Sequence, residues 1–161
     1  MLTFTYFATP HLIGQVTPAC GPVKGYTQIT VKGKNFNEFG DGTAKCVFNA
    51  TYFMNATVLD LETIACDTPP LESTNGDMFY NVSVTLDGTF FTNATGRFNY
   101  YKELTIDSVT PSLGPLEGGT QSLITGSGFN QSNVCDLRVR YGQIHQVPSD
   151  VTKNSLTAYS P

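Results

Sequence analysis

An internal repeat with a period of 93 residues constrains the fold of this chain more than any other sequence feature. Residues 16–37 read VTPACGPVKGYTQITVKGKNFN, and residues 109–130 read VTPSLGPLEGGTQSLITGSGFN. Eleven of these 22 aligned positions are identical, whereas unrelated segments of ordinary composition would share about one or two. The match indicates two copies of one structural unit in series.

Most of the identical positions suit a chain of short β-strands. In the shared TP-x-x-GP segment, proline fixes one φ angle and glycine permits a positive φ, so one extended run ends and another begins. The Gly-x-x-Phe segments, Gly33 to Phe36 and Gly126 to Phe129, each predict a turn and a buried aromatic side chain at the end of a strand.

The composition favours the same structural class. The chain has 22 threonines and 10 serines, and only 14% of its residues are charged. Such residues suit pleated strands, whereas the charged helix formers are scarce. Alternation predicts seven strands in the first copy, at residues 12–17, 27–32, 44–48, 57–60, 63–66, 80–86 and 97–101. We therefore expect an all-β fold, with two antiparallel sheets packed as a sandwich in each complete unit.

The second copy carries a pattern that identifies the chain with a known family. Residues 106–129 read I-x-x-V-x-P-x-x-GP-x-x-GG-T-x-x-x-I-x-G-x-x-F and resemble an IPT/TIG domain. This immunoglobulin-like module occurs in plexins, in fibrocystin-like proteins and in many microbial surface proteins. The resemblance covers nearly the whole chain and implies tandem immunoglobulin-like β-sandwiches. One departure is Tyr26, which stands where the second copy has Gly119.

The internal alignment also predicts the domain boundaries. We expect the first IPT/TIG domain at residues 11–102 and the second at residues 103–161, where the second ends at the position of Pro69 and so lacks its last two strands. Residues 1–10 begin with MLTFTYF, which is similar to the last strand of a unit. Two explanations remain open: the chain is a segment of a longer array, or this spare strand completes the open domain of another chain.

The four cysteines fall at informative positions. The family often carries a disulfide between its third strand and the strand that ends in TP, so the resemblance implies a pair between Cys46 and Cys66. Cys20 and Cys135 remain, and an interdomain bridge between them competes with two unpaired thiols or with bridges to other chains. No C-x-x-C spacing occurs, so we expect no zinc site.

N-glycosylation sequons are more frequent than the composition predicts. The N-x-S/T pattern occurs five times among 11 asparagines, where chance gives about two. The acceptor residues are Asn49, Asn55, Asn81, Asn93 and Asn130. Sequons together with paired cysteines predict an N-glycosylated protein that is extracellular or at the cell surface. The alternative is an intracellular protein with incidental sequons.

Several other classes of function do not fit the sequence. The net charge of −4 and a pI of about 4.9 give no basic face for nucleic acid. No apolar stretch is long enough to cross a membrane, and the first eight residues do not read as a signal peptide. His11 and His145 have unrelated sequence settings, and the carboxylates are scattered. We therefore expect no catalytic residues, no metal and no cofactor.

Three functions are compatible with these observations, and we favour the first, that of a non-catalytic, N-glycosylated structural module. The first is a structural module of a surface filament, stalk or coat, assembled with copies of itself or with neighbouring domains of a long chain. The second is a spacer in a receptor or adhesin ectodomain, which an exposed aromatic patch at Tyr52, Phe53, Phe90 and Phe91 would favour, although alternation predicts about half of these in the core. The third is an accessory domain of a secreted enzyme that acts on polysaccharide.

Overall fold

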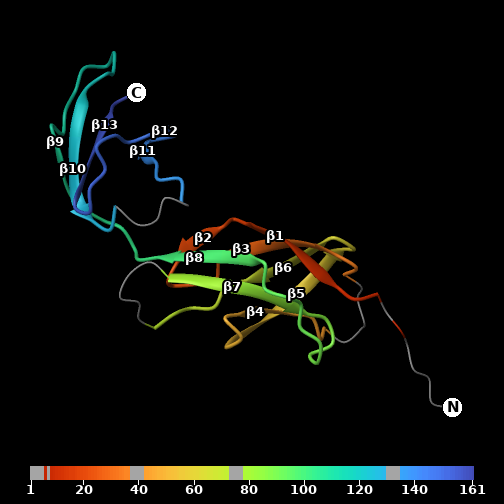
Figure 1. Ribbon diagram of the computed structural model, residues 1–161. Coiled ribbons are helices and arrows are strands. Elements are labelled where there is room, and N and C mark those ends of the chain that lie inside the picture. The colour runs from red at the N-terminus through yellow and green to blue at the C-terminus, as the bar shows by residue number, and fades with distance from the viewer. Residues whose placement is uncertain (1–5, 7, 37–41, 73–77, 130–134) are drawn as a thin grey trace. The chain divides into compact units, whose positions relative to one another are not determined.

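A computed structural model describes residues 6, 8–36, 42–72, 78–129 and 135–161, and the regular structure in this part of the chain consists of β-strands (Figure 1). The expected all-β class is confirmed. The chain divides into two compact units, Met1–Tyr100 and Tyr101–Pro161. The strand predicted near the N-terminus falls almost entirely outside the described residues, as does Asn130.

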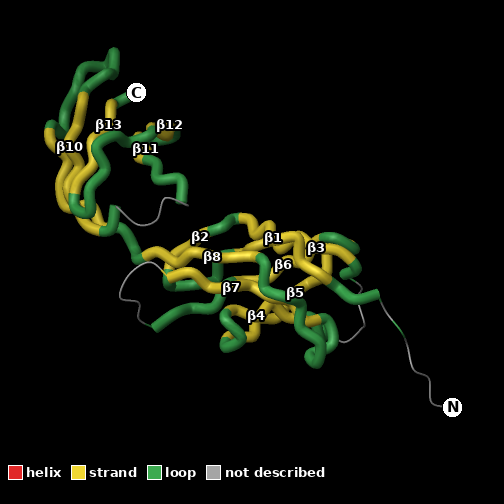
Figure 2. Tube along the Cα trace, viewed as in Figure 1, coloured by secondary structure: helices red, strands yellow, loops and turns green. Residues whose placement is uncertain are grey.

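Unit 1 contains a mainly antiparallel sheet whose strands are hydrogen-bonded from edge to edge, and Figure 2 shows its strands in yellow. Its strand order is β1-β3-β6-β5-β4-β7-β8-β2. The strands are β1 (His11–Thr17), β2 (Cys20–Pro22), β3 (Gln28–Lys34), β4 (Lys45–Phe48), β5 (Tyr52–Asp60), β6 (Thr63–Asp67), β7 (Met78–Thr85) and β8 (Gly96–Tyr101). All seven predicted strands are present. The sequence analysis missed β2 and began β5 five residues too late.

Strand β5 changes partners halfway along its length, and this change folds the sheet into two layers. Its first half, Tyr52 to Asn55, pairs with β4, whereas its second half, from Ala56 onward, pairs with β6. The two halves of the sheet can therefore face each other as the layers of a sandwich while remaining hydrogen-bonded through one strand.

The core of unit 1 lies between these layers. Side chains from both halves of the sheet form one buried cluster. Among its largest fully buried members are Ile29, Val31, Phe36, Phe48, Ile64, Val82, Val84, Phe98 and Tyr100. Tyr100 packs edge-on against Phe98, with ring centroids 5.0 Å apart, and its hydroxyl donates a hydrogen bond to the carbonyl of Pro69 at 2.9 Å. Burial raises the pKa of Tyr100, so the ring stays a neutral hydrogen-bond donor in the core.

The repeated Gly-x-x-Phe segment acquires a physical explanation in the structure. A Cβ atom on Gly33 would collide with the buried ring of Phe36 and with the carbonyl oxygen of His11. In unit 2 a Cβ atom on Gly126 would lie 2.7 Å from the ring of Phe129. The phenylalanine in each unit therefore packs directly over the backbone of the glycine three residues earlier.

Unit 2 repeats part of this architecture with fewer buried residues. Its strands are β9 (Thr105–Thr110), β10 (Gln121–Ser127), β11 (Val139–Tyr141), β12 (Ile144–Gln146) and β13 (Ser155–Tyr159). The order β13-β10-β9 matches β6-β3-β1 of unit 1, and β11 and β12 form a separate hairpin. The buried cluster comprises Ile124, Phe129, Leu156 and Ala158. A cis Thr–Pro bond follows the first strand of each unit.

Candidate functional site

The Cys46–Cys66 disulfide lies at the point where β5 changes partners. Cys46 on β4 is opposite Met54, and Cys66 on β6 is opposite Ala56. The two Cα atoms are 6.4 Å apart, within the range that a disulfide bridges without backbone movement. Both cysteines are buried in the core of unit 1. The predicted pair is thus a covalent link between the two layers of the sandwich.

Cys20 and Cys135 belong to different units of the chain. Cys20 is the first residue of β2 in unit 1. Cys135 belongs to unit 2, where it follows residues 130–134 and precedes β11. Neither is a free thiol in the part of the chain that the structure describes. Their pairing with each other stays a prediction.

Four sequon asparagines lie on unit 1 with exposed side chains. Asn55 is on β5 and Asn81 is on β7, whereas Asn49 follows β4 and Asn93 lies between β7 and β8. Strand register joins the segments that carry them into one sheet, because β4 pairs with both β5 and β7. The neighbours of Asn55 and Asn81 in the chain, including Met54 and Val82, pack in the core, so the asparagines point away from it. We call this outward surface of β5, β4 and β7 the sequon face.

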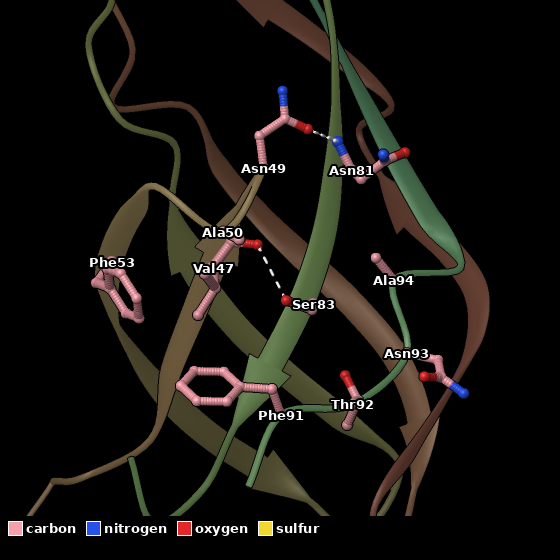
Figure 3. A pocket seen from close by; sticks show the side chains of 10 residues that line it. All are labelled: Val47, Asn49, Ala50, Phe53, Asn81, Ser83, Phe91, Thr92, Asn93 and Ala94. Atoms are coloured by element: carbon pink, nitrogen blue, oxygen red, sulfur yellow. Dashed lines mark hydrogen bonds between the residues drawn. The ribbon is translucent and has the colours of Figure 1, made fainter. Parts of the chain in front are cut away.

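A groove of about 570 Å³ opens on the sequon face (Figure 3). Three of the four sequon asparagines line it. Its lining residues are Val47, Asn49, Ala50, Phe53, Asn81, Ser83, Phe91, Thr92, Asn93 and Ala94. Figure 3 shows the rings of Phe53 and Phe91 toward one side of the groove, with Asn81 and Asn93 toward the other. The groove therefore has an apolar aromatic wall and an amide-bearing rim.

The aromatic wall is built from two strands and a loop. Phe53 from β5 and Phe91 from the loop after β7 meet edge to face, with ring centroids 6.2 Å apart and an interplanar angle of 76°. Val47 of β4 lies directly opposite Phe53 in the strand register and is fully covered. The two rings thus pack over the outer side of the sheet, where they shield Val47 from water.

The structure corrects one expectation about these aromatics. About half of Tyr52, Phe53, Phe90 and Phe91 were predicted to lie in the core, but all four are exposed. The reason is that Tyr52 and Phe53 occupy the start of β5, at the rim of unit 1, where neither side of the strand is fully covered. Phe90 and Phe91 belong to the β7–β8 loop, where the residue turned toward the protein is Thr92.

Asn49 is oriented by the backbone of Asn81. Its φ angle is +48°, a left-handed conformation that asparagine tolerates better than most residues. The Oδ1 atom of Asn49 accepts a hydrogen bond from the N–H of Asn81 at 2.8 Å, and the N–H of Asn49 donates to the Asn81 carbonyl at 2.9 Å. With Oδ1 engaged, the amide nitrogen of Asn49 points away from β7 (Figure 3).

Hydrogen bonds to Asp87 fix the conformation of the loop that carries Phe91. The carboxylate of Asp87 accepts hydrogen bonds from the N–H groups of Phe90 and Thr89, each at 2.9 Å, and from the Thr89 hydroxyl at 2.7 Å. These donors, the Phe90 N–H foremost, lower the pKa of Asp87 to about 2. The ionised carboxylate therefore organises the turn that leads into the groove.

Two further results concern other kinds of site. Within the described ranges, no three His, Cys, Asp or Glu side chains gather in a way that could hold a metal ion. His11 lies on β1 and His145 on β12, in different units. No helix in the described part of the chain has the length and apolar character needed to cross a membrane.

The chain is similar in sequence to a known domain family and to two known proteins. The family model for the IPT/TIG domain matches residues 11–100 and 104–161. Human plexin-A4 is 32% identical over 127 residues, which cover 76% of this chain and 7% of that protein. Mouse fibrocystin-L is 29% identical over 128 residues, covering 78% of this chain and 3% of that protein. The chain thus spans less than a tenth of the length of these curated relatives.

A solved structure shares the fold. The structure of the full extracellular region of plexin A4 aligns with a TM-score of 0.52 and 22% sequence identity. The alignment covers 94% of this chain and 15% of that structure. The immunoglobulin-like fold of this chain therefore has a counterpart of known structure.

Proposed function

Because this chain belongs to the IPT/TIG domain family, we propose that it is a non-catalytic segment of an extracellular region, in which its two units space other domains along a longer polypeptide. The similarity to plexin-A4, whose extracellular region has been solved, supports this role. The partners in this proposal are the neighbouring domains of the same polypeptide. Fold alone does not determine function, so the argument also depends on the chemistry of unit 1.

One observation carries the proposal: a disulfide-bonded unit presents four exposed sequon asparagines on one face. A buried disulfide in the core of a small sandwich is typical of proteins that fold in an oxidising compartment. The same compartment contains the enzyme that modifies sequons. The two features therefore point to the same route, secretion to the cell surface or beyond.

We propose that these asparagines carry N-linked glycans. In that reaction the side-chain amide nitrogen of asparagine forms a bond to C1 of an N-acetylglucosamine and loses a proton. The lipid diphosphate that carried the oligosaccharide leaves. The exposed amides of Asn49, Asn55, Asn81 and Asn93 have room for such a group, because each lies on the solvent side of the sheet.

Secretion of the full chain from cultured animal cells tests the proposal. Peptide mass mapping after enzymatic release of glycans in heavy-oxygen water should mark Asn49, Asn55, Asn81 and Asn93, and nonreduced peptides should show Cys46 joined to Cys66. The same chain expressed without a secretion signal is the control and should carry no mark. Unmodified mass at all four sites in secreted protein would overturn the glycosylated extracellular role.

Self-association into a filament is a second candidate, and one observation favours it. Among the described residues β11 pairs only with β12, whereas β4, which follows β3 in unit 1 as β11 follows β10 in unit 2, pairs with β5 and β7. A strand from another chain could pair with the open edge of β11. Sedimentation velocity over a hundredfold range of concentration separates the two candidates: a constant monomer mass would exclude filament formation by this chain.

A further inference from the structure

Three exposed phenylalanines of unit 1 stand in the same relation to three sequons. We propose that each phenylalanine is a platform for the first N-acetylglucosamine of the glycan on the asparagine two residues later. The pairs are Phe53 with Asn55, Phe79 with Asn81, and Phe91 with Asn93. This inference rests on the N-glycosylation proposed above and adds a role for the aromatic side chains of the sequon face.

The three phenylalanine–asparagine pairs share one local sequence pattern. Residues 53–57 read FMNAT, residues 79–83 read FYNVS and residues 91–95 read FTNAT. Random placement of 11 phenylalanines in 161 residues would put fewer than one of them two positions before any of the five sequons. The observed number is three, all in unit 1.

Strand geometry brings each phenylalanine and its asparagine to the same side of the sheet. Successive residues of a strand point to opposite faces, so residues two apart share a face. Phe53 and Asn55 both belong to β5, and Met54 between them packs against the core. Phe79 and Asn81 both belong to β7, and Tyr80 between them is buried.

The third pair follows the same rule although it lies in a loop. Thr92, between Phe91 and Asn93, is buried. Its N–H donates to the carbonyl of Val84 at 2.9 Å, and its hydroxyl oxygen accepts from the N–H of Val84 at 2.9 Å. This bonding turns Thr92 toward β7 and leaves its two neighbours exposed.

The rings have apolar surface available for a sugar. Phe53 is 50% exposed, Phe79 is 54% exposed and Phe91 is 43% exposed. N-acetylglucosamine presents C–H groups on the faces of its ring, and these groups pack favourably against the electron-rich face of an aromatic ring. Same-face neighbours along a strand are about 7 Å apart, a distance that aromatic and long side chains can bridge.

Because the sugar is covalently attached, its contact with the phenylalanine ring costs little entropy. A sugar that is already bonded to Asn55 or Asn81 stays at high local concentration beside its phenylalanine, so even a weak packing energy favours the contact. Contact with the sugar removes exposed aromatic surface from water, in a chain of which only 14% of the residues are charged.

Asn49 is a natural control within the same face. The residue two positions before it is Val47, which is only 1% exposed and offers no surface to a sugar. The Oδ1 atom of Asn49 is also held by the N–H of Asn81. We therefore expect a glycan on Asn49 to project into solvent without an aromatic partner.

Nuclear magnetic resonance of the secreted full chain tests the inference. The glycans are first trimmed with endoglycosidase H to one N-acetylglucosamine per site, and phenylalanine is isotope-labelled. We expect nuclear Overhauser contacts between each of the three rings and the sugar on its own asparagine, with upfield-shifted sugar protons. The sugar on Asn49 should show neither effect.

A double-mutant cycle provides an independent readout for the pair Phe53 and Asn55. Phe53→Ala is compared in the trimmed glycoprotein and in the Asn55→Gln background, where the contact of Phe53 with Phe91 is lost in both arms and cancels. The substitution should raise the unfolding equilibrium constant about threefold more when the sugar is present, as expected for a same-face aromatic pair. A parallel cycle of Phe53→Ala with Asn49→Gln should give no difference.

The outcomes separate the two proposals. Asparagines with unmodified mass would overturn both the glycosylation and the platform role. Fully occupied sites that show no ring contact and no coupling would overturn the platform role alone, and would leave the Phe53–Phe91 groove open to a separate partner.

Discussion

The Oδ1 atom of Asn49 accepts a hydrogen bond from the backbone N–H of Asn81, 2.8 Å away, so one predicted glycosylation site is held by the backbone of another. The two residues are 32 positions apart in the sequence. Their contact joins the turn after β4 to the middle of β7, and it fixes one end of the groove on the sequon face.

This contact predicts a stability effect that is independent of sugar. In protein made without glycans, Asn49→Ala should lower the free energy of unfolding by about 1 to 3 kcal/mol, because the hydrogen bond is lost and alanine adopts a positive φ less readily. Asn55→Ala is the matched control and should change stability by less than about 0.5 kcal/mol, since Asn55 is exposed on β5. Urea denaturation measures both, and equal effects would contradict the role of the contact.

The Cys46–Cys66 disulfide predicts a loss of folding stability when it is removed. Replacing both Cys46 and Cys66 by alanine opens a loop whose ends are 20 residues apart, which should cost about 3 kcal/mol on the chain-entropy estimate. Thermal unfolding of the double variant should therefore begin at a lower temperature than that of the parent chain. The Cys66→Ala single variant should lose about as much, because either change breaks the bond. A double variant that unfolds at the parent temperature would show that the bond adds nothing to stability.

The Gly-x-x-Phe contact predicts that alanine at Gly33 destabilises the protein more than alanine at Gly42. Gly33→Ala should destabilise unit 1 by about 2 kcal/mol or more, because the new methyl group meets both the Phe36 ring and the His11 carbonyl. Gly42→Ala should cost only about 1 kcal/mol, since Gly42 has a positive φ but no atom of the described residues lies within 4 Å of its missing side chain. Chemical denaturation ranks the two variants, and the reverse order would disprove the packing explanation of the motif.

The turn at Asp87 predicts a dependence on acid pH. The folded-state pKa of Asp87 is lowered from 3.8 to about 2, so its stabilising effect is fully present above about pH 4 and is lost as the pH falls toward 2. Asp87→Asn should be less stable than the parent at pH 6 and should lose less stability between pH 4 and pH 2. Asp107→Asn on the exposed strand β9 serves as the control and should keep the parent profile. Stability measured across this pH range tests the sign directly.

The sequence predicted most of the fold because its informative signals are local. The repeated TP-x-x-GP and Gly-x-x-Phe segments depend on turn geometry and on contacts three residues apart, which a pattern can reveal. The first half of β5 was missed for the opposite reason. Tyr52 and Phe53 are adjacent apolar residues, so they break alternation, and they are extended because β4 pairs with them from the other side of a turn.

In the candidate site, too, local features could be predicted from the sequence and long-range pairing could not. Each sequon could be found one at a time, and the exposure of Asn49, Asn55, Asn81 and Asn93 agrees with their polar character. Their convergence on one face depends on the register of β4 with its neighbour β5 and with β7, and the pairing of β4 with β7 joins segments more than 30 residues apart. The phenylalanine two positions before three of the sequons was a local signal, but it has a meaning only after the facing direction of each strand is known.

The bond between Cys46 and Cys66 also determines how unit 1 would respond to a mechanical load. A pull applied to the chain on either side of this unit passes across the sulfur atoms, so the turn at Asn49, the partner change in β5 and the hairpin before Cys66 carry no tension. Full extension of the unit would be shorter by roughly 65 Å, the length of about 20 extended residues. Under reducing conditions that hidden length would become available, and the same force would stretch the spacer further.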